Sequence, residues 1–295
     1  MVTHKLLLDV GANDGLHTLL KLRLVHAWGS YGLKDPSLIF NYCTLWNDEE
    51  GTLIQGLAPP NLTDHFSALL QLGNVYFVSG FRVQPPGPVY RSCSHKLAIV
   101  LSIDTKFEDV TASSPNFCPE AFEFVPFSSL HSRIRSPSYL TDVVGSVVSV
   151  TGLSHTFTTF GDNVRRELVL QNESHMLLDI TLWGDIARAV DGEELAFLGR
   201  DGVVVLALGS LKVTAATRGG FALSNTPGTR ILLEPSSDMA DVIRSAITHR
   251  GLQLLPRLLL LRIRVRKLLR RSWTCVVLPP SMCVFGDVAC CFCCS

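Results

Sequence analysis

The sequence has no excess of either charge: 26 Lys and Arg residues balance 26 Asp and Glu residues, and charged residues make up only 18% of the chain. The balance is uneven, because residues 250–295 contain eight basic residues and one acidic residue. That leaves 18 basic and 25 acidic residues, a net charge of −7, in residues 1–249. A protein that binds nucleic acid by charge alone carries a basic excess. This body therefore excludes such a mechanism unless its basic residues gather on one face.

The N-terminus has no apolar run of the kind that a signal peptide requires, because Lys5, Asp9 and Asp14 interrupt it. We therefore expect an intracellular protein. The body is also poor in cysteine, which excludes a disulfide scaffold. Its three cysteines are Cys43, Cys93 and Cys118.

No catalytic motif is present: the sequence contains no H-E-x-x-H, no G-x-S-x-G and no phosphate-binding loop. We predict a protein that is not an enzyme and has no cofactor and no metal site. One alternative is left open by "LLLDVGANDG", residues 6–15, which resembles the first motif of S-adenosylmethionine-dependent methyltransferases, with Asp35 placed to hold a ribose. That motif requires a helix after Gly15, whereas residues 16–28 alternate as a strand does.

The chain does contain enough apolar residues, 47% of 295, to bury the cores of two domains. Its first half shows three alternating strands, a helix and two further strands, an order typical of an OB barrel. The segments are 16–28, 37–46, 52–58, 61–73, 74–84 and 90–102.

The same order recurs in the second half, with Gly145 permitting the curvature of its first strand. The segments are 139–150, 164–172, 175–183, a short helix 184–190, 202–214 and 229–235. The predicted fold is all-β, with two tandem five-stranded OB barrels that each carry a short helix. Four domains are predicted: a first OB domain (1–107), a linker (108–138), a second OB domain (139–248) and an atypical tail (249–295).

The ordered segments "SYLTDVVGSVVSV", "VRRELVLQNES" and "LLDITLWGDIA" resemble the second single-strand-binding domain of the large (70 kDa) subunit of replication protein A, in a divergent plant-type copy. "HFSALLQLGNVYFVSGFRV" and "YRSCSHKLAIVL" resemble the first such domain. "FEFVPFSSLHSRI" resembles the connector between them. The resemblance covers roughly residues 16–247. It implies sequence-tolerant binding of single-stranded DNA in the nucleus, in replication, repair or recombination.

The resemblance also implies which rings stack on bases. It assigns a stacking role to Trp183 of "TLWG", with a core position as the alternative, and it favours Tyr90 in the first domain. The second platform of the second domain is missing, because Ala216, Thr217 and Arg218 stand in its place. Phe221 is an equally weighted candidate for that platform or for the core.

Phosphate contacts are expected from basic residues on the outer strands. The candidates are Arg82, Arg91, Arg165, Arg166, Lys212 and Arg218. Because strand side chains alternate, Arg165 and Arg166 point to opposite faces, so at most one of them faces the groove.

The tail changes abruptly to Leu and Arg and then to Cys, and one hypothesis is that residues from about 251 are not native coding sequence. Its paired C-x-x-C spacing suits zinc, but no surrounding strand-turn pattern supports a site. The expected partners are single-stranded DNA and other replication protein A subunits, although no segment of the sequence resembles the trimerising domain of that family. We do not expect the protein to bind a membrane. The alternative function is a degenerate OB module for protein contacts.

Overall fold

The computed structural model describes residues 3–31, 39–87, 90–115, 117–134, 139–158, 161–215 and 220–251. They divide into two compact units, one that runs to Glu123 and includes residues 139–140, and one that contains residues 124–134 and continues from Thr141. The segment expected as a linker, 108–138, thus contributes to both units. Arg218, Asp35 and the tail from residue 252 lie outside the described residues.

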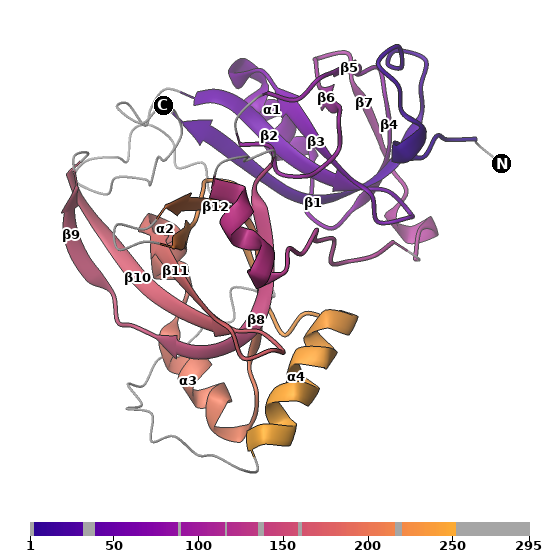
Figure 1. The fold of residues 1–295 in the computed structure, drawn as a ribbon. Helices are drawn as coiled ribbons and strands as arrows, with labels where there is room; N and C mark the ends of the chain where they lie inside the picture. The colour runs from indigo at the N-terminus through magenta and orange to yellow at the C-terminus, as the bar shows by residue number, and fades with distance from the viewer. Residues whose placement is uncertain are drawn as a thin grey trace. The chain divides into compact units, whose positions relative to one another are not determined.

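The first unit is a curled seven-stranded sheet with the strand order β5-β6-β3-β2-β1-β4-β7 and one α-helix, α1 (Thr63–Leu69) (Figure 1). Its strands are β1 (Leu20–Tyr31), β2 (Ile39–Asn47), β3 (Leu53–Ala58), β4 (Val75–Ser79), β5 (Arg82–Gln84), β6 (Ala98–Val100) and β7 (Lys106–Asp109). Short 3₁₀ turns complete it, at Leu7–Asp9, Pro60–Leu62 and Thr111–Ser113.

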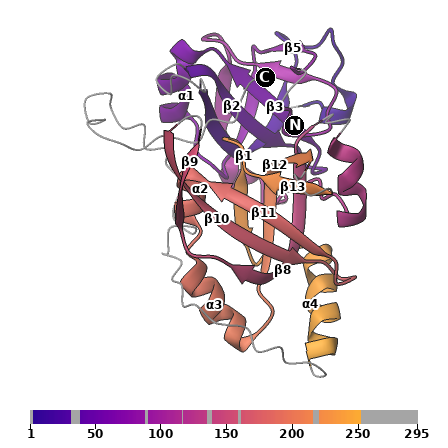
Figure 2. The same cartoon turned by 60° about the vertical axis from the view of Figure 1, so that its left-hand side comes forward.

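The second unit repeats this plan with a second seven-stranded sheet. Its strands are β8 (Thr141–Val150), β9 (Ser154–Thr158), β10 (Gly161–Gln171), β11 (Leu177–Trp183), β12 (Val205–Ala215), β13 (Phe221–Ser224) and β14 (Arg230–Leu233). Its helices are the 3₁₀ helix η4 (Phe127–Ile134), α2 (Gly184–Ala189), α3 (Gly192–Asp201) and α4 (Asp238–Gly251). Figures 1 and 2 both show α3 and α4 at the same end of this barrel, and the sequence pattern predicted neither helix.

Both sheets close in the way that an OB barrel does, because in each unit the strand just before the first α-helix pairs in parallel with a strand that follows that helix. In the first unit β3 pairs in parallel with β6, and in the second unit β11 pairs in parallel with β13. The predicted all-β fold of two tandem OB barrels is confirmed. The predicted strand over 90–102 is reduced to three residues, Ala98–Val100.

Each barrel encloses its own apolar core, built from alternate strand residues. In the first unit the core includes Leu20, Leu22 and Leu24 of β1 together with Trp46 and Phe66. In the second unit it includes residues of β10, β11 and β12 and also Phe127 and Leu130 of η4. The segment before β8 is therefore part of the second core.

A bulge in β12 lets this strand pair with different neighbours along its length. Ser210 has a left-handed backbone with φ of 59°, and the register with β8 shifts between Leu208 and Leu211. The buried Asp142 carboxylate accepts the Ser210 N–H at 2.8 Å and lies 3.4 Å from Arg230. The first half of β12 pairs with β8 and β14, and the second half pairs with β13.

We expect Gly145→Ala to destabilise the protein by about 1–3 kcal/mol. A Cβ at Gly145 would lie 3.0 Å from the Gln171 carbonyl oxygen and 3.0 Å from the Leu170 Cβ, where backbone cannot give way. Urea unfolding followed by fluorescence measures the loss. The control is Gly152→Ala, because no atom lies within 4 Å of a Cβ built there. Equal urea midpoints for the two variants would contradict the close packing around Gly145.

Candidate nucleic-acid interface

Two neighbouring strands of the second unit, β10 and β11, divide their side chains between the core and the outside. Leu178, Ile180 and Leu182 of β11 are buried in the core, so Thr181 and Trp183 point outward. On β10, Leu168 and Leu170 belong to the core. The odd-numbered residues between the buried positions of β10 therefore share the outer face with Trp183.

Strand pairing brings three of the predicted residues together on this outer face. Arg165 is the direct cross-strand partner of Trp183. A second row crosses four strands, from Glu167 on β10 through β11 and β13 to Lys212 on β12. We call this surface the second-unit face, and it consists of Arg165, Glu167, Thr181, Trp183, Lys212 and Ser224.

The position of Trp183 is fixed at its backbone. The Asn225 side-chain oxygen accepts the Trp183 N–H at 2.7 Å, and the Asn225 amide donates to the Trp183 carbonyl at 3.3 Å. Gly184, with φ of 58°, then turns the chain into α2. Asn225 is buried. Sequence reasoning missed it, because an Asn after a short strand is typical of any turn.

The charges of the second-unit face are close to balance. The Arg165 Nη2 atom lies 3.6 Å from the Glu167 Oε1 atom, and both side chains are partly exposed. Asp179 is exposed and, by the alternation of β11, lies on the same side as Trp183. A phosphate that approaches Arg165 therefore meets a carboxylate beside it.

Arg166 lies on the opposite side, as strand alternation predicted for one of the pair. It is buried, and its guanidinium donates to the Ala187 carbonyl at 3.0 Å and to the Thr151 carbonyl at 2.7 Å. Burial lowers the pKa of Arg166, and the charge of Asp191 acts in the opposite direction. Its place in the structure is to hold α2 on the barrel, so we leave it out of the interface.

Phe221 also lies on the core side of its strand. It packs against the second core, and its ring contacts that of His131 edge-on, with centroids 6.5 Å apart. Of its two candidate positions, the structure places the ring with the core. By contrast, the sequence pattern did not single out Phe157, which is 86% exposed on β9. Since Phe157 pairs with Asp162, alternation places it on the other face of the hairpin from Arg165.

The first-unit candidates lie in the loop before β6 and on the edge strand β5. Tyr90 precedes β6, outside any strand, with a left-handed φ of 59°. The Arg91 guanidinium donates to the carbonyls of Ser94 and His95, at 3.3 and 2.8 Å. Arg82 is exposed on β5.

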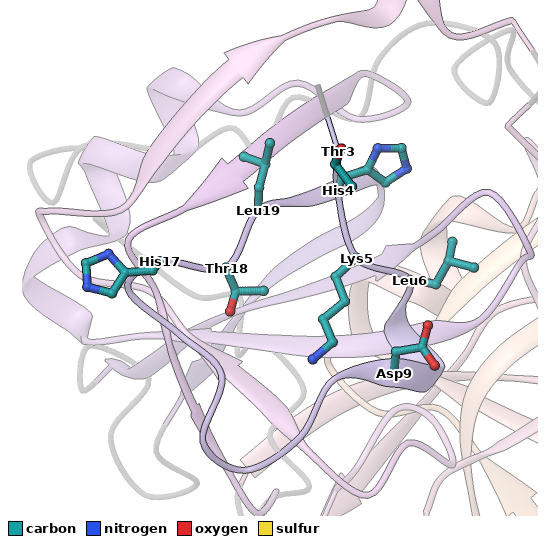
Figure 3. Close-up of a pocket in the computed structure, with 8 residues that line it drawn as sticks. All are labelled: Thr3, His4, Lys5, Leu6, Asp9, His17, Thr18 and Leu19. Atoms are coloured by element: carbon teal, nitrogen blue, oxygen red, sulfur yellow. The ribbon is translucent and has the colours of Figure 1, made fainter. Parts of the chain in front are cut away.

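The segment that resembles a methyltransferase motif contributes Leu6 and Asp9 to an open pocket in the first unit. The residues that line this pocket are Thr3, His4, Lys5, Leu6, Asp9, His17, Thr18 and Leu19. Figure 3 shows His17 and Leu6 pointing in opposite directions, so these side chains do not converge on one centre. The Asp14 carboxylate accepts the Gly11 N–H at 2.6 Å and pairs with Lys5 at 2.7 Å. After Gly15 the chain enters β1 and not the helix that the motif requires.

Neither a metal nor a membrane site emerges from the residues described. Among them, no group of three or more His, Cys, Asp or Glu side chains could hold a metal ion. In the same part of the chain, no helix combines the length and the apolar character needed to cross a bilayer.

The fold is that of the OB class of domains, and comparison with known proteins narrows the class of protein. No family model matches the chain. The chain is 28% identical over 207 residues to a replication protein A 70 kDa DNA-binding subunit of Arabidopsis thaliana, and the match covers 69% of the chain and 32% of that protein. It is 28% identical over 202 residues to another protein of the same description from that plant, and 24% identical over 207 residues to one from Oryza sativa subsp. japonica.

Among solved structures, a replication protein A heterotrimer bound to single-stranded DNA matches with a TM-score of 0.53 and 21% identity, over 83% of this chain and 55% of that one. This likeness supports the OB fold. The chain spans about a third of the length of the plant relatives described above. The predicted resemblance to the large subunit of replication protein A is confirmed, at the distance of a divergent relative, and those relatives are named as DNA-binding subunits and not as enzymes.

We expect the two neighbouring arginines of β10 to differ in their effect on stability. Arg166→Met removes two hydrogen bonds from a charged donor to backbone carbonyls and should cost about 2–3 kcal/mol. Arg165→Met is the matched control and should change the free energy of unfolding by less than about 0.5 kcal/mol, since its ion pair is exposed. Urea midpoints measure both. A larger loss for Arg165→Met would show that the strand faces are reversed.

Proposed function

We propose that the chain binds single-stranded DNA through the second-unit face, tolerantly of sequence and without catalysis, in nuclear DNA replication, repair or recombination. The observation that carries this is the Trp183 ring, half-buried at the end of β11, with the partly exposed Arg165 directly opposite on β10. A ring beside a cation supplies both contacts that a single strand offers, a base to stack and a phosphate to pair.

The relatives support this proposal, because their names describe DNA-binding subunits and the similar solved structure holds single-stranded DNA. Assembly with other subunits, as in the heterotrimer of that structure, is part of the proposal and rests on the similarity alone. The near balance of charge on the face predicts weaker phosphate attraction than a basic groove would provide.

We expect Trp183→Ala to weaken binding of a fluorescein-labelled oligothymidylate by about 5- to 150-fold, the effect of losing one stacked base. Fluorescence anisotropy at two salt concentrations measures it. The dependence on salt should stay unchanged, because no phosphate contact is lost. Phe197→Ala is the matched control, since that ring is 59% exposed on α3 and off the face.

Equal affinities of Trp183→Ala and Phe197→Ala would overturn the role of the ring. No binding at micromolar protein and low salt would overturn the proposed function. That result would favour the alternative, an OB module that keeps the fold for protein contacts.

We expect Glu167→Gln to strengthen binding, by roughly 3- to 10-fold at low salt, because it removes the carboxylate that competes with phosphate for Arg165. The salt dependence should become steeper. The same anisotropy titration measures both. Glu173→Gln, in the exposed turn between β10 and β11, changes the net charge equally away from the face. An equal gain in the control would show that only the total charge matters.

A further inference from the structure

The same outer face exists in the first unit, but there it is buried. On β2 and β3 the core takes Tyr42, Trp46 and Ile54. The alternate residues form a separate apolar cluster on the other side of the sheet, and its buried members are Trp28, Cys43, Leu45, Leu53, Cys93 and Ala121. The corresponding strands of the second unit, β10 and β11, expose Arg165, Glu167 and Asp179.

The cover comes from the chain itself, from residues 117–123, which we call the strap. Phe117 and Ala121 of the strap are buried. The Cys118 carbonyl accepts hydrogen bonds from Arg23 of β1 at 2.9 Å and from Asn47 of β2 at 3.2 Å. The strap therefore crosses both strands on their outer side.

The strap also uses the cations that this face would offer to a phosphate. Lys21 lies 5.3 Å from the centroid of the Phe117 ring and pairs with Glu49 at 2.6 Å. Arg23 donates to the carbonyls of Gly73 and Cys118. Burial lowers the pKa of Arg23, and the charge of Glu120 acts in the opposite direction.

A second cover, the 91–97 loop, meets the strap at its end. The Glu123 carboxylate accepts the Ser94 N–H at 2.7 Å and the Ser94 hydroxyl at 2.8 Å. The Ser92 N–H donates to the side chain of Gln55, an outward residue of β3, at 3.2 Å. Charge-assisted hydrogen bonds such as those of Glu123 are the strong ones, so this contact latches the two covers together.

We propose that the strap and the 91–97 loop, latched by Glu123, keep the outer face of the first barrel closed, so that only the second unit binds single-stranded DNA. The closed face is a second apolar core in place of a groove. Its rings, including Trp28 stacked on His26 at 5.3 Å, serve packing. The statement about DNA rests on the proposed function, whereas the closed face stands on the contacts alone.

Cysteine alkylation tests the closed face, because the full chain carries its own reporters. Cys43 lies on β2 under the covers and Cys93 is buried within the 91–97 loop, whereas Cys118 of the strap is exposed. Burial also raises the pKa of the Cys93 thiol to about 12, so it reacts only when the face opens. Timed pulses of iodoacetamide, with peptide mass spectrometry to assign each cysteine, compare the rates with and without oligothymidylate, and anisotropy on the same sample reports binding.

We expect Cys118 to react on the order of 100-fold faster than Cys43 and Cys93, with no change when the oligonucleotide saturates the protein. Rates at Cys43 and Cys93 equal to that at Cys118 would overturn the closed face. An acceleration of tenfold or more on saturation would show that DNA opens it and would overturn the restriction of binding to the second unit. If the oligonucleotide fails to bind, the proposed function fails, while slow labelling still supports the closed face.

Glu123→Ala tests the latch. It should speed the labelling of Cys93 by roughly tenfold, because both hydrogen bonds to Ser94 are lost. Glu108→Ala, on the exposed side of β7, is the control and should leave the rate unchanged. An unchanged rate in Glu123→Ala would overturn the role of Glu123 as the latch.

Discussion

Closure of a small sheet into a barrel commits one side of every strand to the interior, and the rest of this protein depends on that constraint. Leu178, Ile180 and Leu182 can fill the second core only if Thr181 and Trp183 face away from it. The outer face is therefore the surface left for a ligand. Whether another segment of the chain covers that face decides whether a ligand can reach it.

The two barrels use their outer faces in opposite ways on the same topology. The second unit leaves polar and charged residues at these positions, with a ring at the strand end held by Asn225. The first unit has apolar residues there, such as Leu45 and Leu53, and these would be costly to expose. Under the proposal, the strap covers these residues and closes the outer face of the first barrel, whereas the second barrel keeps an accessible face.

The periodicity of the sequence carried most of the fold, because a period of two is a local property of the chain. It placed β1, β10 and β11, and it predicted that Arg165 and Arg166 would separate. It could not say which of the two faces outward, since that depends on the register with distant strands. The position of the strap could not be predicted for a related reason. Residues 117–123 show no periodicity of their own, and they are held in place by contacts such as that between Cys118 and Arg23, 95 positions apart. Asn225 and the short β9 escaped notice because turn-type and polar residues there fit many structures.

The acidic excess of residues 1–249 argued against nucleic-acid binding by charge alone. The structure shows where individual carboxylates act on the two outer faces. On the second-unit face Glu167 competes for Arg165, and in the first unit Glu49 takes Lys21 while Glu123 closes the covers. Glu167 and Glu49 each pair with a cation that could otherwise bind a phosphate, and Glu123 holds together the two segments that cover the first-unit face. Stacking does not suffer this competition, because the face of a ring attracts a base whatever the local charge. If the chain binds single-stranded DNA as proposed, its affinity rests on Trp183 more than on its arginines, and the dependence of binding on salt should be correspondingly shallow.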